Sequence, residues 1–166
     1  MNITENINRL SFYILAFLMI PLKSGNTQEV NFQELLVDVD YAEFVTHIWT
    51  PNSANAETII ALPGSGADVS RYKYIGPLLA KAGYKLVAIN QRGILGSSGN
   101  LEGITLRDLA RDVVTIADKL GINKFHMAGW AFGNRTSRML ATIYPERLAS
   151  LILIAAGGLV PALTQP

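Results

Sequence analysis

Short apolar runs alternate with amphipathic helical patterns along most of the chain. Runs of this kind, bounded by turn-forming residues, are typical of strands that are buried on both faces of a parallel sheet. They cover residues 58–62, 85–90, 125–128 and 150–156. Apolar positions at helical spacing lie between them, in residues 71–82, in residues 105–120 and in a segment that ends near residue 143. This alternation predicts an α/β fold, with a mostly parallel sheet and helices on both faces.

Two earlier segments, residues 35–39 and 44–49, alternate with a period of two and flank a polar turn. They predict an antiparallel hairpin at one edge of the sheet.

The longest helical pattern has clear ends. Thr105 is a good N-cap for it, and Gly121 ends it. One face of this helix is apolar and comprises Leu106, Leu109, Val113, Ile116, Ala117 and Leu120.

The beginning of the chain carries a different signal. Residues 10–22 form an uncharged apolar run that follows Arg9 and gives way to a polar stretch. This run is too short to cross ~30 Å of hydrocarbon, but it suits the central region of a secretory signal. We expect residues 1–27 to be a signal peptide or N-terminal anchor, and the protein to be periplasmic or extracellular. The alternatives are a buried N-terminal helix in a cytoplasmic protein, or weak membrane association through residues 10–22.

Length and composition bound the remaining possibilities. A chain of 166 residues, of which 49% are apolar, can form one domain with a sizeable core, here residues 35–166. Fourteen basic and thirteen acidic side chains, with no basic run, give no support for a nucleic-acid partner. The chain has no cysteine, which excludes thiolate catalysis and cysteine-based zinc sites. We expect neither a metal nor a cofactor.

The candidate chemistry lies in residues 129–133, between a predicted strand and a predicted helix. The stretch reads Gly129-Trp130-Ala131-Phe132-Gly133. It resembles the nucleophile elbow of the α/β-hydrolase family, whose G-x-S-x-G motif presents a serine on a strained strand-to-helix turn. Both glycines stand at the spacing of the family's motif. The nucleophile position holds Ala131.

Three further landmarks extend this resemblance over about residues 35–158. Residues 62–66 are similar to the family's His-Gly-x loop, with Pro63 in place of the histidine. Residues 90–99 are similar to its Asp-x-Arg-Gly-x-Gly-x-Ser loop, with Asn90 in place of the aspartate. The segments on either side of residues 129–133 also follow the family's order. The resemblance implies an incomplete α/β-hydrolase fold that lacks the last strands, in a family whose activity is the hydrolysis of ester, amide or similar bonds in small molecules.

The family's catalytic triad runs in the order nucleophile, acid, histidine. Ala131 has no oxygen with which to attack, and no histidine follows it in the sequence. Only Glu146 and the chain terminus supply carboxylates after Ala131. We therefore expect no triad hydrolysis, and a role as a small-molecule binder or a truncated copy. The alternative is a hydrolase or lyase whose acid and histidine lie in a missing C-terminal part.

The resemblance also implies which residues would contact a ligand. The backbone N–H groups of Ser65 and Phe132 would form an oxyanion hole, and Gly64 and Trp130 would lie against a bound small molecule. Asn134 and Arg135 open the helix after the elbow, where we expect Asn134 to satisfy free N–H groups.

Three expectations concern residues outside this site. His126 is expected to be a core residue with a backbone partner, and His47 to lie on the surface. An uncovered apolar face on residues 151–156 would allow self-association.

Overall fold

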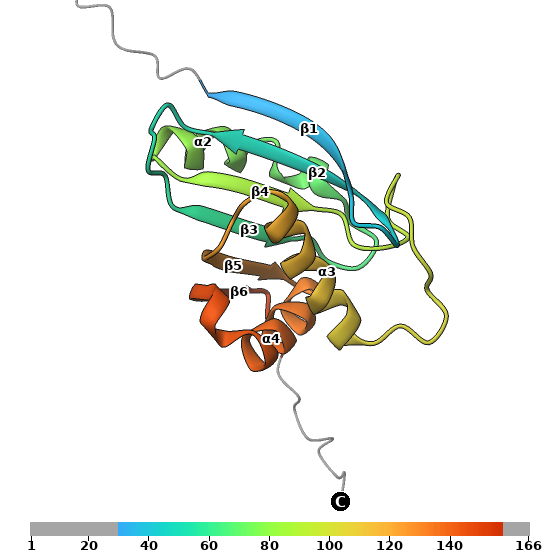
Figure 1. The fold of residues 1–166 in the computed structure, drawn as a ribbon. Coiled ribbons are helices and arrows are strands. Elements are labelled where there is room, and N and C mark those ends of the chain that lie inside the picture. Colours follow the sequence, from blue (N-terminus) through green and yellow to red (C-terminus); the bar gives the residue numbers. More distant parts are fainter. Residues whose placement is uncertain (1–29, 158–166) are drawn as a thin grey trace, which may run out of the picture.

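The computed structural model describes residues 30–157, which form a six-stranded sheet with helices on both faces (Figure 1). The signal or anchor expected in residues 1–27 lies outside the described residues. The strands are β1 (Asn31–Asp38), β2 (Glu43–Thr50), β3 (Thr58–Leu62), β4 (Lys85–Ile89), β5 (Phe125–Trp130) and β6 (Leu148–Ile154). The helices are η1 (Val69–Tyr72), α2 (Ile75–Lys81), α3 (Leu106–Lys119), α4 (Gly133–Ile143) and η2 (Pro145–Arg147).

The strand order is β1-β2-β4-β3-β5-β6. The hairpin of β1 and β2 is antiparallel and joins β4 antiparallel, whereas β3, β4, β5 and β6 pair in parallel. The predicted edge hairpin and parallel sheet are therefore confirmed. Strand β1 begins earlier than its sequence pattern suggested, because pairing with β2 continues out to Asn31 opposite Thr50.

Alternate residues of the central strands pack into two separate cores, one on each face of the sheet. On one face, Ile60, Val87 and Met127 pack with the apolar residues of α3 and with Leu140 of α4. On the other face, neighbouring residues of the same strands, including Ile59 and Leu86, pack with η1 and α2. Because both faces are covered, these strands are almost continuously apolar.

The helix predicted over residues 71–82 is interrupted. It consists of η1 and α2, with a break at residues 73–74. Pro77 lies in the first turn of α2, and it has no N–H with which to continue a helix from the preceding turn. Gly76 lies against the ring of Trp49, where a Cβ would overlap the aromatic atoms. Position 76 therefore has no room for a side chain, because Trp49 packs directly against it.

Helix α3 begins as the sequence predicts. The Thr105 side chain accepts a hydrogen bond from the Asp108 N–H, and the Asp108 carboxylate accepts one from the Thr105 N–H, which completes a capping box. The hydrogen bonds from Thr105 hold the pKa of the Asp108 carboxyl below its usual value.

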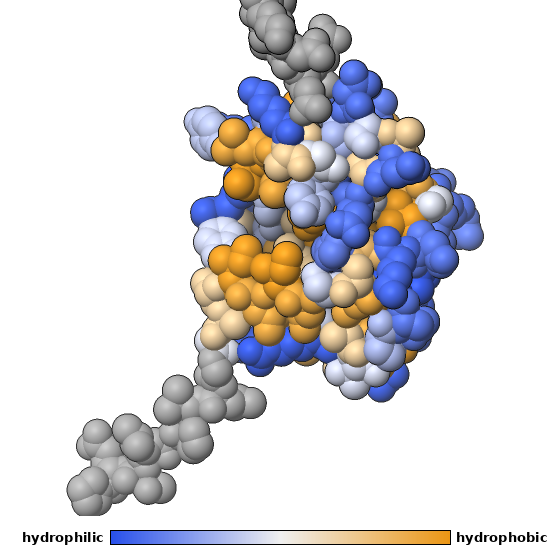
Figure 2. All heavy atoms as spheres, turned by 90° about the vertical axis from the view of Figure 1, so that its left-hand side faces the viewer, coloured by the Kyte–Doolittle hydropathy of each residue, from blue (hydrophilic) through white to orange (hydrophobic). Residues whose placement is uncertain are grey.

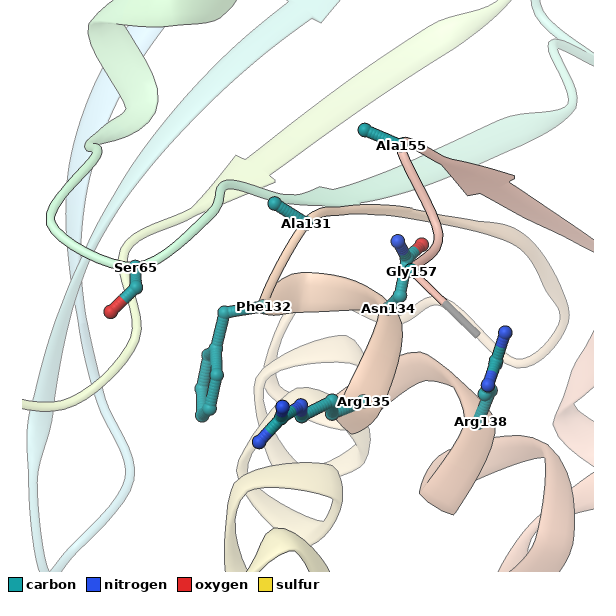
Figure 3. Close-up of a pocket in the computed structure, with 8 residues that line it drawn as sticks. All are labelled: Ser65, Ala131, Phe132, Asn134, Arg135, Arg138, Ala155 and Gly157. Atoms are coloured by element: carbon teal, nitrogen blue, oxygen red, sulfur yellow. The ribbon is translucent and has the colours of Figure 1, made fainter. Parts of the chain in front are cut away.

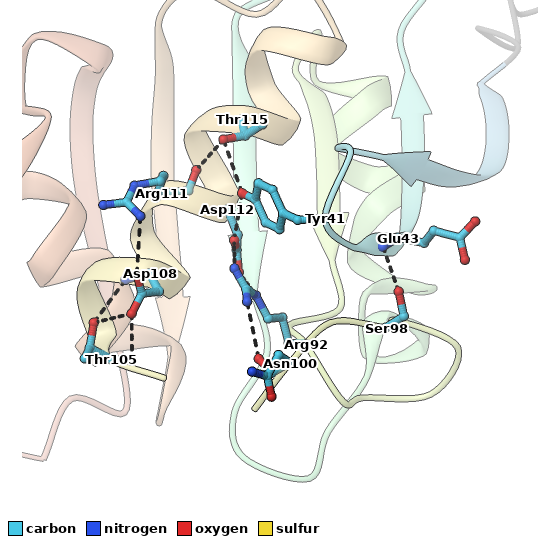
Figure 4. Close-up of polar contacts among 10 residues, drawn as sticks. All are labelled: Tyr41, Glu43, Arg92, Ser98, Asn100, Thr105, Asp108, Arg111, Asp112 and Thr115. Carbon is cyan, nitrogen blue, oxygen red and sulfur yellow. Dashed lines mark hydrogen bonds and ion pairs between the residues drawn. The ribbon is translucent and has the colours of Figure 1, made fainter. Parts of the chain in front are cut away.

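A buried ion pair ties the loop after β4 to α3 (Figure 4). The guanidinium of Arg92 donates to both carboxylate oxygens of Asp112, at 2.6 and 2.7 Å, and only 4% of the Asp112 side chain is exposed. The hydroxyl of Tyr41, from the β1–β2 turn, donates to the same carboxylate at 3.0 Å. Hydrogen bonding to Asp112 raises the pKa of the Arg92 guanidinium. Three segments distant in sequence are thus joined by one charged group.

The burial and the contacts of the two histidines differ in part from what the sequence predicted. His126 is half-buried, and its Nδ1 lies 2.8 Å from the Ser150 hydroxyl, so its partner is a side chain and the expected backbone partner was wrong. His47 is half-buried rather than a free surface residue. Its ring contacts those of Phe32 and Trp49, which also contact each other, and its Nε2 lies 3.0 Å from Glu34.

Strand β6 forms one edge of the sheet and, among the described residues, pairs only with β5. Its side chains Leu151, Ile152 and Ile154 are 37–51% exposed. Figure 2 shows apolar side chains gathered in patches on one side of the molecule.

Candidate functional site

The parallel strands end together at one edge of the sheet, at Leu62, Ile89, Trp130 and Ile154. From β3 the chain continues to β4 on one side, and from β4 it crosses to β5 on the other side of β3. The connections therefore diverge between β3 and β5. Open α/β sheets bind ligands at such a switch point, outside the carboxyl ends of the strands.

Ala131 lies at this point, on the turn between β5 and α4. Its φ is +49°, in the left-handed region that non-glycine residues rarely adopt. The Ala131 N–H donates to the Ile154 carbonyl at 3.0 Å, and the Ala131 carbonyl accepts from the Asn134 N–H at 3.1 Å. The methyl group is exposed and projects from the turn (Figure 3). Strained conformations of this kind are frequent at functional sites.

The two glycines around the turn are required by packing. A Cβ on Gly133 would lie 2.6 Å from the Leu62 carbonyl oxygen, and one on Gly129 would lie 2.6 Å from the Gly133 carbonyl oxygen. The turn therefore has no room for a larger residue at either place. The loop after β3 is also close, because a Cβ on Gly64 would lie 3.1 Å from the Cβ of Ala131.

Two backbone donors flank Ala131. The N–H groups of Ser65 and Phe132 make no hydrogen bond to any other described backbone group. The Phe132 nitrogen lies close to the β3 loop, 3.9 Å from where a Gly64 Cβ would stand. Free N–H groups at the start of a helix can bind an oxygen atom that carries negative charge.

A hollow of about 370 Å³ opens beside these groups (Figure 3). We call it the elbow hollow. Its described lining residues come from the loop after β3, the turn after β5, helix α4 and the end of β6. They are Ser65, Ala131, Phe132, Asn134, Arg135, Arg138, Ala155 and Gly157.

A smaller hollow of about 170 Å³ adjoins it, and Ser65 and Phe132 line both. We call this one the apolar hollow. Apart from these two residues, its described lining comprises Gly64, Gln91, Arg92, Ile94, Leu101, Ile104 and Leu109.

Buried polar side chains hold the surrounding loops in place. Asn90 accepts a hydrogen bond from the Val69 N–H at 2.8 Å and donates to the Leu95 carbonyl at 3.1 Å. Gln91 accepts from the hydroxyl of Thr136 on α4 at 3.1 Å. The sequence analysis did not predict these roles, although two polar residues directly after a buried strand indicate buried hydrogen bonds at its end.

Asn134 does not cap the helix, so that expectation was wrong. Its side-chain amide donates to the Ile154 carbonyl at 2.9 Å, which ties α4 to the end of β6. Its Oδ1 is buried and accepts no hydrogen bond from any described residue. Unsatisfied buried acceptors are rare, and each one calls for a specific explanation.

The structure brings together six of the predicted site residues: Gly64, Ser65, Gly129, Ala131, Phe132 and Gly133. Trp130 is placed differently, because it lines neither of the two hollows in the described part of the chain. Instead the Arg71 guanidinium lies 4.4 Å from the centre of its ring, a cation–π contact.

Two groups near Arg71 have shifted pKa values. Hydrogen bonds from Ser70 hold the pKa of the Asp68 carboxyl below its usual value, and burial raises the pKa of the Tyr72 hydroxyl.

Within residues 30–157, no three His, Asp or Glu side chains are grouped so that they could hold a metal ion. No helix in that same range has the length and apolar character needed to span a membrane.

Residues 57–165 match the family model for the alpha/beta hydrolase fold, which is more than half of the chain. The chain therefore belongs to the α/β-hydrolase family, and both the resemblance and the fold class predicted from the sequence are confirmed.

Several relatives are hydrolases. A 2-hydroxy-6-oxo-6-phenylhexa-2,4-dienoate hydrolase from Comamonas testosteroni is 30% identical over 85% of this chain and 49% of that protein. A 2-hydroxy-6-oxononadienedioate/2-hydroxy-6-oxononatrienedioate hydrolase from the same organism is 35% identical over 65% of this chain and 39% of that protein. The crystal structure of a membrane phospholipase A, a bacterial virulence factor, has a TM-score of 0.71 at 27% identity and covers 79% of this chain and 42% of that one. The chain spans less than half the length of each.

Proposed function

We propose that this member of the α/β-hydrolase family binds a small molecule at the elbow hollow and does not hydrolyse it through a serine nucleophile. Ala131 carries the proposal. It stands at the exposed left-handed turn where the family's motif has its serine. A methyl group has no proton to release and no lone pair with which to attack. No histidine follows Ala131 in the sequence to act as a base.

Binding a ligand requires hydrogen-bond donors and space, but neither a nucleophile nor a base. The free N–H groups of Ser65 and Phe132 flank Ala131 and face no described backbone acceptor. Preorganised backbone donors can hold a carbonyl or carboxylate oxygen without any nucleophile. This arrangement supports the assignment of both groups as an oxyanion-binding pair.

The test removes one donor. Replacing Ser65 with proline deletes its N–H, whereas Ser65→Ala keeps it and removes only the hydroxyl. We expect a ligand found by NMR fragment screening at the Phe132 amide to bind Ser65→Pro about tenfold more weakly, the cost of roughly 1.5 kcal/mol for one hydrogen bond to a charged oxygen. Binding to Ser65→Ala should be unchanged. A screen in which no fragment shifts the Ser65 or Phe132 amides would refute the proposal.

A second candidate is a hydrolase or lyase whose acid and histidine lie outside this sequence. The relatives favour it, because those named above are hydrolases and the chain matches less than half of each. In this reading a water or a substrate group would take the place of the missing serine. Coding DNA that continues in frame past Pro166 with an aspartate and a histidine would support it.

We also propose that the chain self-associates through β6. The strand presents an unpaired edge among the described residues, with the apolar side chains Leu151, Ile152 and Ile154 exposed. Such edges pair readily with other strands. We expect size-exclusion chromatography to show an apparent mass that rises with concentration, and Ile152→Lys to abolish that rise. A wild-type chain that stays monomeric at every concentration would contradict this.

A further inference from the structure

The elbow hollow carries two positive charges and no negative one among its described lining residues. Arg135 and Arg138 lie one turn apart on α4, and both line the hollow (Figure 3). Neither forms an ion pair with a described carboxylate, although Arg92, Arg111 and Arg147 each do. Guanidinium groups without a partner favour an anion, and their planar geometry suits a carboxylate.

The backbone adds to this preference. Helix α4 has eleven residues and no acidic residue in its first turn, so its positive end is not neutralised from within the helix. The free N–H groups of Ser65 and Phe132 lie at the same end. This end of the site is therefore strongly polar.

The adjoining apolar hollow has the opposite character. Ile94, Leu101, Ile104 and Leu109 make up much of its lining. Ser65 and Phe132 line both hollows, so the two lie side by side. The volumes of about 370 and 170 Å³ fall, taken together, in the range of small-molecule sites. A ligand that filled both hollows would have a charged end and an apolar end.

We propose that the ligand is an amphiphilic carboxylate, with its carboxylate in the elbow hollow that Arg135 and Arg138 line and its apolar chain in the hollow lined by Leu101 and Ile104. This inference rests on the proposed function, because it names the chemical class of the molecule that the elbow hollow binds. The two arginines are specificity-determining residues in this proposal.

The experiment compares three probes on the full chain by ¹H–¹⁵N NMR titration. Octanoate carries both features, octanamide lacks the charge, and acetate lacks the chain. We expect octanoate to shift the Ser65 and Phe132 amides, and octanamide and acetate each to bind at least about tenfold more weakly, since one charge-assisted contact or a few buried methylenes is enough for that ratio.

Single substitutions test which residues contact the charged end of the ligand and which contact its apolar chain. Arg135→Gln and Arg138→Gln should each weaken octanoate binding about fivefold to tenfold and leave octanamide unaffected. Arg107→Gln is the matched control, because Arg107 is an exposed arginine on α3 that lines neither hollow. It removes the same charge and should change nothing. Leu101→Ser, at a side chain that is 54% exposed, should reduce the advantage of octanoate over acetate with little cost to folding.

Two results would overturn the inference. One is equal affinity for octanoate and octanamide, and the other is octanoate binding that Arg107→Gln weakens as much as Arg135→Gln does. In either case fragments would still bind at the elbow hollow, and the proposed function would stand. If no probe or fragment shifts the Ser65 and Phe132 amides, both proposals fail together.

Discussion

Replacing Asp112 with alanine is expected to destabilise the protein by about 3–5 kcal/mol, because it leaves the Arg92 guanidinium buried without its partner. Arg92 donates to both oxygens of Asp112, and the two side chains are 13% and 4% exposed. The Tyr41 hydroxyl also loses its acceptor. Urea unfolding followed by circular dichroism measures the change as a lower midpoint with a similar slope.

The control lies on the same helix. Arg111 pairs with Asp108 at 3.4 Å, but the two side chains are 55% and 33% exposed. Exposed pairs contribute about 0–1 kcal/mol, so Arg111→Gln should scarcely move the midpoint. The double variant Arg92→Met/Asp112→Leu should be more stable than Asp112→Ala, since it removes both charges. If Asp112→Ala costs no more than Arg111→Gln, the ion pair does not anchor the loop.

The ion pair also shows what the sequence could not predict. Arg92 and Asp112 are twenty residues apart, and neither belongs to a local pattern that indicates a pairing. The same is true of the two hollows, whose lining residues come from segments that are far apart in the sequence. Contacts of this kind depend on how the loops fold back over the sheet, and periodicity carries no information about that.

Features that depend on local geometry were predictable. The elbow could be located because Gly129 and Gly133 leave no room for a Cβ, so their spacing is a direct consequence of the turn. The Thr105 capping box and the apolar strand β3 follow from short-range rules in the same way. The break before α2 was missed although Pro77, whose missing N–H cannot continue a helix from the preceding turn, was visible in the sequence; the close contact of Gly76 with the distant Trp49 was not. Sequence patterns therefore predicted the place of the site better than its chemistry.

Restoring the serine alone is expected not to restore hydrolysis. Ala131→Ser places a hydroxyl on the turn at φ +49°, but a serine hydroxyl is a weak nucleophile unless an adjacent base takes its proton. The two histidines of the chain lie elsewhere. His47 contacts Glu34 on the hairpin, and His126 contacts Ser150 near the start of β5, at the opposite end of that strand from the elbow.

The expected result is a turnover of an activated ester about 10⁶-fold below that of a complete triad, for the wild-type chain and for Ala131→Ser alike. Release of p-nitrophenol from p-nitrophenyl acetate should show no burst in either protein. Intact-mass spectrometry after treatment with a fluorophosphonate should show no adduct on either, with a serine hydrolase labelled in parallel to verify the reagent.

An adduct on Ala131→Ser that is absent from the wild-type chain would show that a base reaches residue 131 within this chain. The proposed lack of triad chemistry would then depend on the missing hydroxyl alone. An adduct on the wild-type chain itself would place a reactive nucleophile somewhere other than the elbow. Peptide mapping of the adduct distinguishes the two cases, because the labelled residue is either 131 or another one.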